Sequence, residues 1–99
     1  MTKKSRDLLV LSNAPDPMPE YIGDPNAEGR RFAIVTARFN ESVTRPMADA
    51  AVDAFVRHGA RLDDIDVVWV PGAWELVAAT RSLAASVRYD ALVAIGAVV

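Results

Sequence analysis

Cysteine is absent from this 99-residue sequence, and histidine occurs only once, as His58. Without cysteine the chain forms no disulfide, carries no thiolate nucleophile and offers no cysteine-ligated metal centre. A single histidine excludes a histidine-rich metal site as well. The 11 basic and 13 acidic side chains leave a net charge of −2, which gives no electrostatic reason to expect a nucleic acid or an anionic membrane as partner.

Common cofactor and catalytic motifs are also missing. The sequence contains no G-x-G-x-x-G, Walker loop, H-E-x-x-H or nucleophile elbow, so nothing local favours a nucleotide cofactor, a zinc ion or serine hydrolysis. The first apolar run covers only residues 8–11, far short of the ~7–15 residues in the apolar part of a secretory signal. A cytoplasmic protein is therefore expected.

Proline and glycine set residues 1–29 apart from the rest. Four prolines and two glycines fall between positions 15 and 29, a composition typical of loops. We expect a flexible leader or arm, which is either a disordered tail or, through residues 8–11, a strand added to a neighbouring subunit. The folded domain is expected to cover residues 30–99.

Three valine-rich apolar runs predict strands at residues 31–37, 65–70 and 90–99, the second of them buried on both faces. Helical periodicity between the runs makes a β-α-β-α-β unit, which predicts an α/β fold with a parallel sheet and right-handed crossovers. A flavodoxin-like, three-layer α/β/α sheet has about five strands in the order 2-1-3-4-5. The third strand would then be an unpaired edge, so we interpret the chain as truncated or split.

Two helices are predicted between the strands. The first is capped by Asn40 or Ser42, carries Pro46 in its first turn and ends at Gly59. Its inward stripe is expected to hold Val43, Met47, Ala50, Ala51, Ala54, Phe55 and His58. The second runs from about residue 73 to 87, with Leu76, Leu83, Ala84 and Val87 facing inward.

The carboxyl ends of parallel strands share one rim, which is where open α/β sheets bind ligands. Phe39 at this rim either stacks on a ligand ring or folds onto its own helix, and Trp74 either packs or contacts the ligand. Glu75 either binds ligand hydroxyls or only complements the helix dipole. An aromatic, hydroxyl-bearing ligand would suit this corner. His58 is expected to have a structural role at its helix end.

Five short blocks carry a resemblance to a known family. In order and spacing they resemble the 6,7-dimethyl-8-ribityllumazine synthases, over about residues 32–99. The blocks are ARFN (37–40), RHGA (57–60), DIDVVWVPGAWE (64–75), YDA (89–91) and GAVV (96–99). The resemblance implies a flavodoxin-like fold and the condensation of 5-amino-6-(D-ribitylamino)uracil with 3,4-dihydroxy-2-butanone 4-phosphate in riboflavin biosynthesis, without cofactor or metal.

The resemblance also implies roles for seven residues. Phe39 would stack on the pyrimidine ring, and Glu75 would accept hydrogen bonds from ribityl hydroxyls. The ribityl chain and ring would lie against Ala73, Trp74 and Glu75, and the pyrimidinedione edge against Ala97, Val98 and Val99.

The sequence departs from the family after Val99. The family's phosphate-binding threonines and its proton-donating histidine are expected beyond this residue, so no catalytic residue is assigned and the 99 residues are expected not to turn over substrate. Family members form pentamers, often joined into sixty-subunit shells. The alternative to an enzyme is a truncated, non-catalytic fragment that binds a ribityl-pyrimidine or takes part in assembly.

Overall fold

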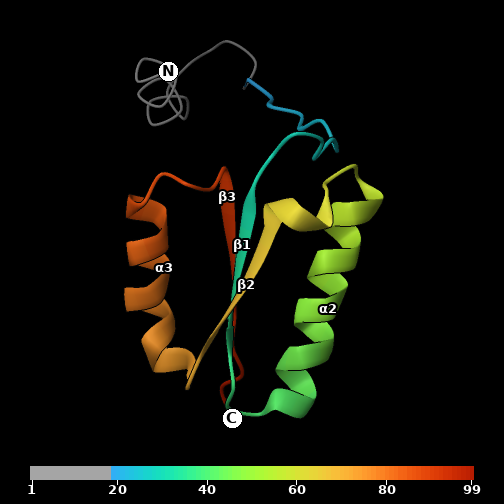
Figure 1. The fold of residues 1–99 in the computed structure, drawn as a ribbon. Helices are drawn as coiled ribbons and strands as arrows, with labels where there is room; N and C mark the ends of the chain where they lie inside the picture. Colours follow the sequence, from blue (N-terminus) through green and yellow to red (C-terminus); the bar gives the residue numbers. More distant parts are fainter. Residues whose placement is uncertain (1–18) are drawn as a thin grey trace.

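The computed structural model describes residues 19–99 and confirms the β-α-β-α-β order (Figure 1). Residues 19–31 form neither helix nor strand, and the strand predicted at residues 8–11 lies outside the described residues. The elements are β1 (Phe32–Ala37), α2 (Glu41–Arg57), β2 (Ile65–Val70), α3 (Leu76–Ala85) and β3 (Ala91–Ile95), with short 3₁₀ turns η2 (Leu62–Asp64) and η3 (Ala73–Glu75).

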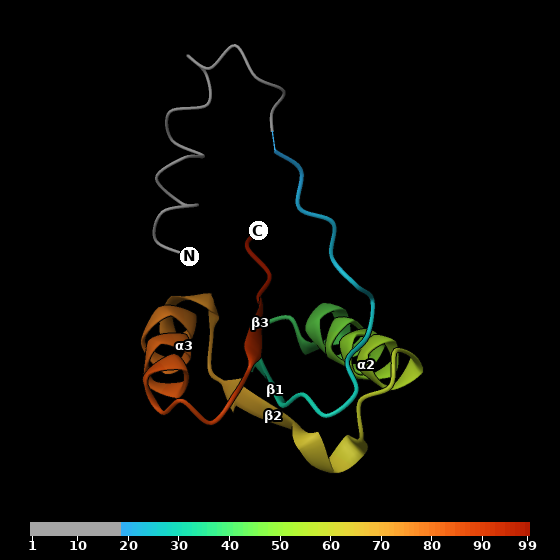
Figure 2. The same ribbon diagram turned by 90° about the horizontal axis from the view of Figure 1, so that it is seen from above.

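The three strands form a parallel sheet in the order β2-β1-β3, the beginning of the predicted 2-1-3-4-5 order. Phe32 of β1 lies opposite Ile65 on one side and Ala91 on the other. Helices α2 and α3 cover opposite faces of the sheet, which gives the expected three layers (Figure 2). Among residues 19–99, no strand pairs with the outer edge of β3.

Strand β1 is the centre of the core, since all six of its residues are buried. Successive side chains point to opposite faces of a strand. Ile34 therefore packs toward α2, with Ala48 and Ile95, whereas Val35 packs toward α3, with Val70. One strand thus supplies the apolar centre of both layers.

The predictions for the other two strands need correction. Strand β2 was expected to be buried on both faces, yet only Val70 is buried and Val67 is 40% exposed. The reason is position, because β2 lies at the sheet edge and β1 takes the buried centre. The third strand ends at Ile95, and residues 96–99 continue without regular structure.

The inward face of α2 is rotated from the predicted stripe. Thr44 and Ala48 are buried, whereas Val43 and Met47 are each 48% exposed. The Thr44 hydroxyl donates a hydrogen bond to the Ala37 carbonyl oxygen at 2.7 Å, which turns this side of the helix toward β1. Of the other residues predicted to face inward, Ala51, Ala54 and Phe55 are half-buried, and Ala50 and His58 are exposed.

The ends of α2 match the prediction only in part. Asn40 occupies the cap position, but it is left-handed, with φ 60°, and its side chain makes no capping hydrogen bond. Pro46 lies inside the helix rather than in its first turn. Gly59, with φ +108°, ends the helix as predicted, because glycine tolerates this conformation. His58 lies at the helix end, with Nδ1 2.8 Å from the Ala54 carbonyl oxygen.

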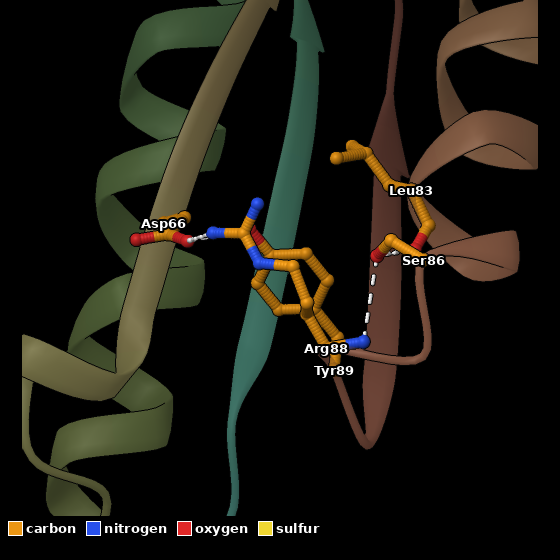
Figure 3. A network of polar contacts seen from close by, with 5 residues as sticks. All are labelled: Asp66, Leu83, Ser86, Arg88 and Tyr89. Carbon is orange, nitrogen blue, oxygen red and sulfur yellow. Dashed lines mark hydrogen bonds and ion pairs between the residues drawn. The ribbon is translucent and has the colours of Figure 1, made fainter.

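Helix α3 is shorter than predicted at both ends. Leu76 and Leu83 pack inward as expected, but Ala84 is exposed and Val87 is 90% exposed. Val87 has φ 52°, so the chain leaves the helical conformation there. The Ser86 hydroxyl, which donates to the Leu83 carbonyl oxygen at 2.6 Å, helps to close the helix (Figure 3).

A polar cluster joins the start of β2 to the segment before β3. The Tyr89 hydroxyl donates to Asp66 Oδ2, and the Arg88 guanidinium lies 3.8 Å from the same carboxylate (Figure 3). The hydrogen bond to Asp66 is the main cause that raises the pKa of Tyr89 above 10.0. Asp66 is the second residue of β2, so the cluster links β2 to the segment before β3 at the amino ends of the strands.

Candidate functional site

The carboxyl ends of the strands lie together at the lower end of the sheet in Figure 1. Two backbone hydrogen bonds join the exits of β1 and β2 there. Arg38 N donates to Val70 O at 2.7 Å, and Phe39 N donates to Pro71 O at 3.0 Å. The loop that carries Phe39 is therefore held against the loop that leads into η3.

An open pocket of about 480 Å³ occupies this rim. It brings together all seven residues to which the resemblance gives a role. Its lining consists of Phe39, Pro71, Gly72, Ala73, Trp74, Glu75, Ala97, Val98 and Val99. Three loops that are far apart in the sequence therefore meet at one surface.

Gly96 lets the third loop approach the second closely. A Cβ atom at this position would lie 2.9 Å from Leu76 Cδ1 and 3.2 Å from Ala73 Cβ, closer than ordinary van der Waals contact. The exit of β3 thus lies directly against the start of α3. In the sequence, Gly96 interrupts an apolar run and begins the GAVV block, and neither signal predicted its packing role.

The rim presents two accessible aromatic rings and a carboxylate. Phe39 is 54% exposed and Trp74 is 90% exposed, so Trp74 does not pack against the rest of residues 19–99. Glu75 is exposed and forms no ion pair with any of residues 19–99. These groups can stack on a flat ligand and accept hydrogen bonds from its hydroxyls.

Backbone donors add to this surface. η3 begins at Ala73, and the N–H groups of Ala73 and Trp74 have no backbone acceptor among residues 19–99. The Glu75 N–H, in contrast, donates to Gly72 O at 3.2 Å. The first N–H groups of a helical turn lack partners within the turn, so they remain available to a ligand.

A larger hollow of about 930 Å³ lies on the outer face of α3. It shares Ala73, Trp74 and Glu75 with the rim pocket and continues along the helix. Its lining consists of Ala73, Trp74, Glu75, Val77, Ala78, Arg81, Ser82 and Ala85. The sequence contained a signal for this face, since most of these residues recur at helical spacing outside the core stripe.

His58 lies far from the rim. It lines a separate pocket together with Phe32 and Ala91, the first residues of β1 and β3, at the amino ends of the strands. Its predicted structural role fits this position. Within residues 19–99, no three histidine, aspartate or glutamate side chains gather where they could hold a metal ion. Nor does the described part of the chain contain a helix long and apolar enough to cross a membrane.

Comparison with known proteins gives consistent matches. The family model for 6,7-dimethyl-8-ribityllumazine synthase matches residues 29–99. The synthase of Gemmatimonas aurantiaca is 56% identical over 82 residues, which cover 83% of this chain and 50% of the relative. That of Desulfotalea psychrophila is 48% identical over 83 residues, 83% of this chain and 54% of the relative. The chloroplastic synthase of Spinacia oleracea is 46% identical over 97 residues, 98% of this chain and 42% of the relative.

The chain therefore spans about half the length of the curated relatives that it matches. The family model covers most of the chain, including all three strands and the rim. The parallel sheet between two helices agrees with the flavodoxin-like fold expected from the resemblance. The chain belongs to the 6,7-dimethyl-8-ribityllumazine synthase family.

Proposed function

We propose that the chain supplies the ribityl-pyrimidine-binding part of a 6,7-dimethyl-8-ribityllumazine synthase. This enzyme condenses 5-amino-6-(D-ribitylamino)uracil with 3,4-dihydroxy-2-butanone 4-phosphate. One observation carries the proposal: all seven residues implied by the resemblance line a single pocket at the strand carboxyl ends. Its volume of about 480 Å³ lies within the range of small-molecule sites.

Each group at the rim has a role in this proposal. The exposed ring of Phe39 stacks on the pyrimidine, and Trp74 offers a second apolar face. The exposed carboxylate of Glu75 accepts hydrogen bonds from ribityl hydroxyls, and such bonds are stronger when the acceptor is charged. The segment Ala97, Val98 and Val99 binds the pyrimidinedione edge, for which its irregular backbone offers donors and acceptors.

We assign no catalytic residue. General acid–base catalysis requires a group within hydrogen-bond reach of the transferred proton, and His58 lies at the opposite end of the sheet. The proton donor and the phosphate-binding groups are proposed to belong to the half of the family's length that this chain does not match. The position of His58 at the opposite end of the sheet also favours the second candidate function, a non-catalytic fragment that binds a ribityl-pyrimidine or takes part in assembly.

We further propose a cytoplasmic homo-oligomer that works without cofactor or metal, as a pentamer or a sixty-subunit shell. Support for association comes from the outer face of α3, where Trp74 is 90% and Val77 is 76% exposed beside a hollow of about 930 Å³. Large exposed apolar surfaces typically mark interfaces.

Isothermal titration of the chain with the ribitylaminouracil tests the binding proposal. Glu75→Ala should weaken binding by more than the ~0.5–1.5 kcal/mol of a neutral hydrogen bond, whereas Glu20→Ala, a change at an exposed glutamate that does not line the rim pocket, should not. Phe39→Ala should also weaken binding of the ribitylaminouracil, because it removes the ring proposed to stack on the pyrimidine. Unchanged affinity in both rim variants would refute the proposed site.

A further inference from the structure

The loop between β1 and α2 consists of residues 38–40 and carries Phe39 at its centre. One side of this loop is bonded to the exit of β2. Arg38 N donates to Val70 O at 2.7 Å, and Phe39 N donates to Pro71 O at 3.0 Å. The backbone before the Phe39 ring is therefore fixed relative to the loop that leads into η3.

The other side of the loop is bonded to the first turn of α2. Asn40 O accepts hydrogen bonds from Val43 N at 2.8 Å and from Thr44 N at 3.0 Å. The dihedral angles φ and ψ of Asn40 lie between these bonds and the bond made by Phe39 N. Because φ and ψ are the soft dihedrals of the backbone, those of Asn40 set the direction in which the chain passes from β1 into α2.

Asn40 adopts the left-handed conformation, with φ 60° and ψ 49°. Residues other than glycine rarely adopt it, and asparagine is one of the few that do so routinely. The side chain makes no capping hydrogen bond, although asparagine is among the preferred capping residues. Nor does Asn40 line the rim pocket. The backbone conformation, rather than a bond of the amide, therefore accounts for asparagine at this position.

Helix α2 is held to the sheet independently of this loop. The Thr44 hydroxyl donates to Ala37 O at 2.7 Å, and Ala48 packs with Ile34 in the core. The ring of Phe39, in contrast, is 54% exposed, so neighbouring side chains hold it only in part. A change in the conformation of residue 40 should therefore displace the Phe39 ring rather than the helix.

We propose that Asn40 is a positioning residue of the rim, whose left-handed backbone holds the Phe39 ring where it can stack on the pyrimidine. The inference rests on the stacking role proposed above for Phe39. Asn40 contacts no substrate and acts only through its neighbour. With a residue that resists the left-handed conformation, the ring is displaced in most molecules, and the apparent affinity falls in proportion to the fraction that remains competent to bind.

Asn40→Ala and Asn40→Gly test the proposal, because glycine adopts the left-handed conformation readily and alanine does not. Isothermal titration of the 99-residue chain with 5-amino-6-(D-ribitylamino)uracil measures the affinity. Asn40→Ala should weaken binding by about five- to thirtyfold, the factor that corresponds to left-handed strain at one residue. Asn40→Gly should stay within about twofold of wild type, as glycine does at cap positions.

Gly29→Ala is the matched control for backbone strain. Gly29 also has a left-handed backbone, with φ +75°, and its surroundings leave room for a Cβ atom, but it does not line the rim pocket. The substitution introduces the same kind of strain away from the ligand. Affinity should therefore change by less than about twofold.

A double substitution separates positioning from folding. A Phe39→Ala background has no ring to position, so the addition of Asn40→Ala should change affinity by less than about twofold. A general loss of folding would instead weaken binding equally in both backgrounds. A loss in the Phe39→Ala background as large as in wild type would therefore overturn the proposal.

Amide hydrogen exchange examines the loop without ligand. The Phe39 N–H, which is bonded to Pro71 O, should exchange at least about fivefold faster in Asn40→Ala, relative to the amides of β1 that report on the core. In Asn40→Gly this ratio should change by less than about twofold. An exchange rate that Asn40→Ala leaves unchanged would overturn the proposal.

The binding results can also refute it. Unchanged affinity in Asn40→Ala would show that the conformation of residue 40 does not limit binding. An equal loss in Asn40→Gly would show that the amide itself contacts the ligand, which overturns an effect through Phe39. If wild type did not bind the ribitylaminouracil, the proposed function would fail, and exchange at Phe39 would still decide whether Asn40 holds the loop.

Discussion

Gly96→Ala tests whether the rim is held together by close packing. The backbone at Gly96 does not have a positive φ, so alanine can adopt its conformation. The added methyl group would nevertheless lie 2.9 Å from Leu76 Cδ1 and 3.2 Å from Ala73 Cβ. The leucine methyl can move away by rotation, but Ala73 Cβ can move only with the backbone of η3. The substitution should therefore displace the start of α3 from the exit of β3.

The expected change in the free energy of unfolding of Gly96→Ala follows from two opposing effects. Overpacking a close contact costs ~1–3 kcal/mol, whereas replacement of glycine by alanine contributes ~0.4–1 kcal/mol by restricting the unfolded chain. The free energy of unfolding should fall by about 1–2 kcal/mol. Leu76→Ala removes the closest contact, so Gly96→Ala should cost less in that background, as expected for directly coupled residues.

Gly72→Ala is the matched control at the same rim. Its backbone is extended, with φ −152°, and the nearest atom to an added Cβ is Glu75 Oε1 at 3.3 Å, the end of a flexible side chain. Its free energy of unfolding should change by less than about 0.5 kcal/mol or rise. Urea unfolding followed by tryptophan fluorescence measures both variants. Equal stability of the two would refute the argument that Gly96 is required for close packing.

Three further predictions concern residues outside the rim, each checked by urea unfolding. Thr44→Val should lose about 1 kcal/mol because its buried hydroxyl is hydrogen-bonded, whereas Thr36→Val should lose nothing or gain, because its hydroxyl has no partner among the described residues. Tyr89→Phe should lose about 0.5–1 kcal/mol near neutral pH, since Asp66 is partly exposed. Because the pKa of Tyr89 is raised in the folded state, its contribution to stability is fully present below pH 10 and is lost as the pH rises above that value. The free energies of unfolding of wild type and Tyr89→Phe should therefore become equal at high pH. A difference between them that does not change with pH would contradict this argument. Val87→Gly should gain about 1 kcal/mol, because φ 52° is strained for a β-branched residue that is 90% exposed; a loss would contradict this reasoning.

The sequence was sufficient to locate the strands, because apolar runs are local signals. It could not show which strand is the most buried. The sequences of β1 (FAIVTA) and β2 (IDVVWV) are both typical of buried strands, yet only β1 is buried throughout. The reason is that β1 has a neighbouring strand on both sides, whereas β2 has one. Neighbours come from distant parts of the chain, so no local pattern contains this information.

The helices show a related limit. Periodicity placed Val43 and Met47 inside, but the hydrogen bond from Thr44 to the end of β1 selects another face of α2. At the rim, the strand–helix pattern singled out Phe39, Trp74 and Glu75, and the family resemblance added the other residues. The structure adds that their loops meet in one pocket. The close packing at Gly96 depends on tertiary contacts and required the structure.

The central position of β1 has a consequence for synthesis on the ribosome. Phe32 pairs with Ile65 and Ala91, which follow it by 33 and 59 residues, and neither pairing can form before its partner strand has been made. At 5–20 residues per second, the second partner arrives about 3–12 s after β1. During this interval the strand that is most buried in the finished sheet has at most one neighbour, which makes it a target for chaperones and for aggregation. Slow codons between β1 and β3 should therefore lower the soluble yield.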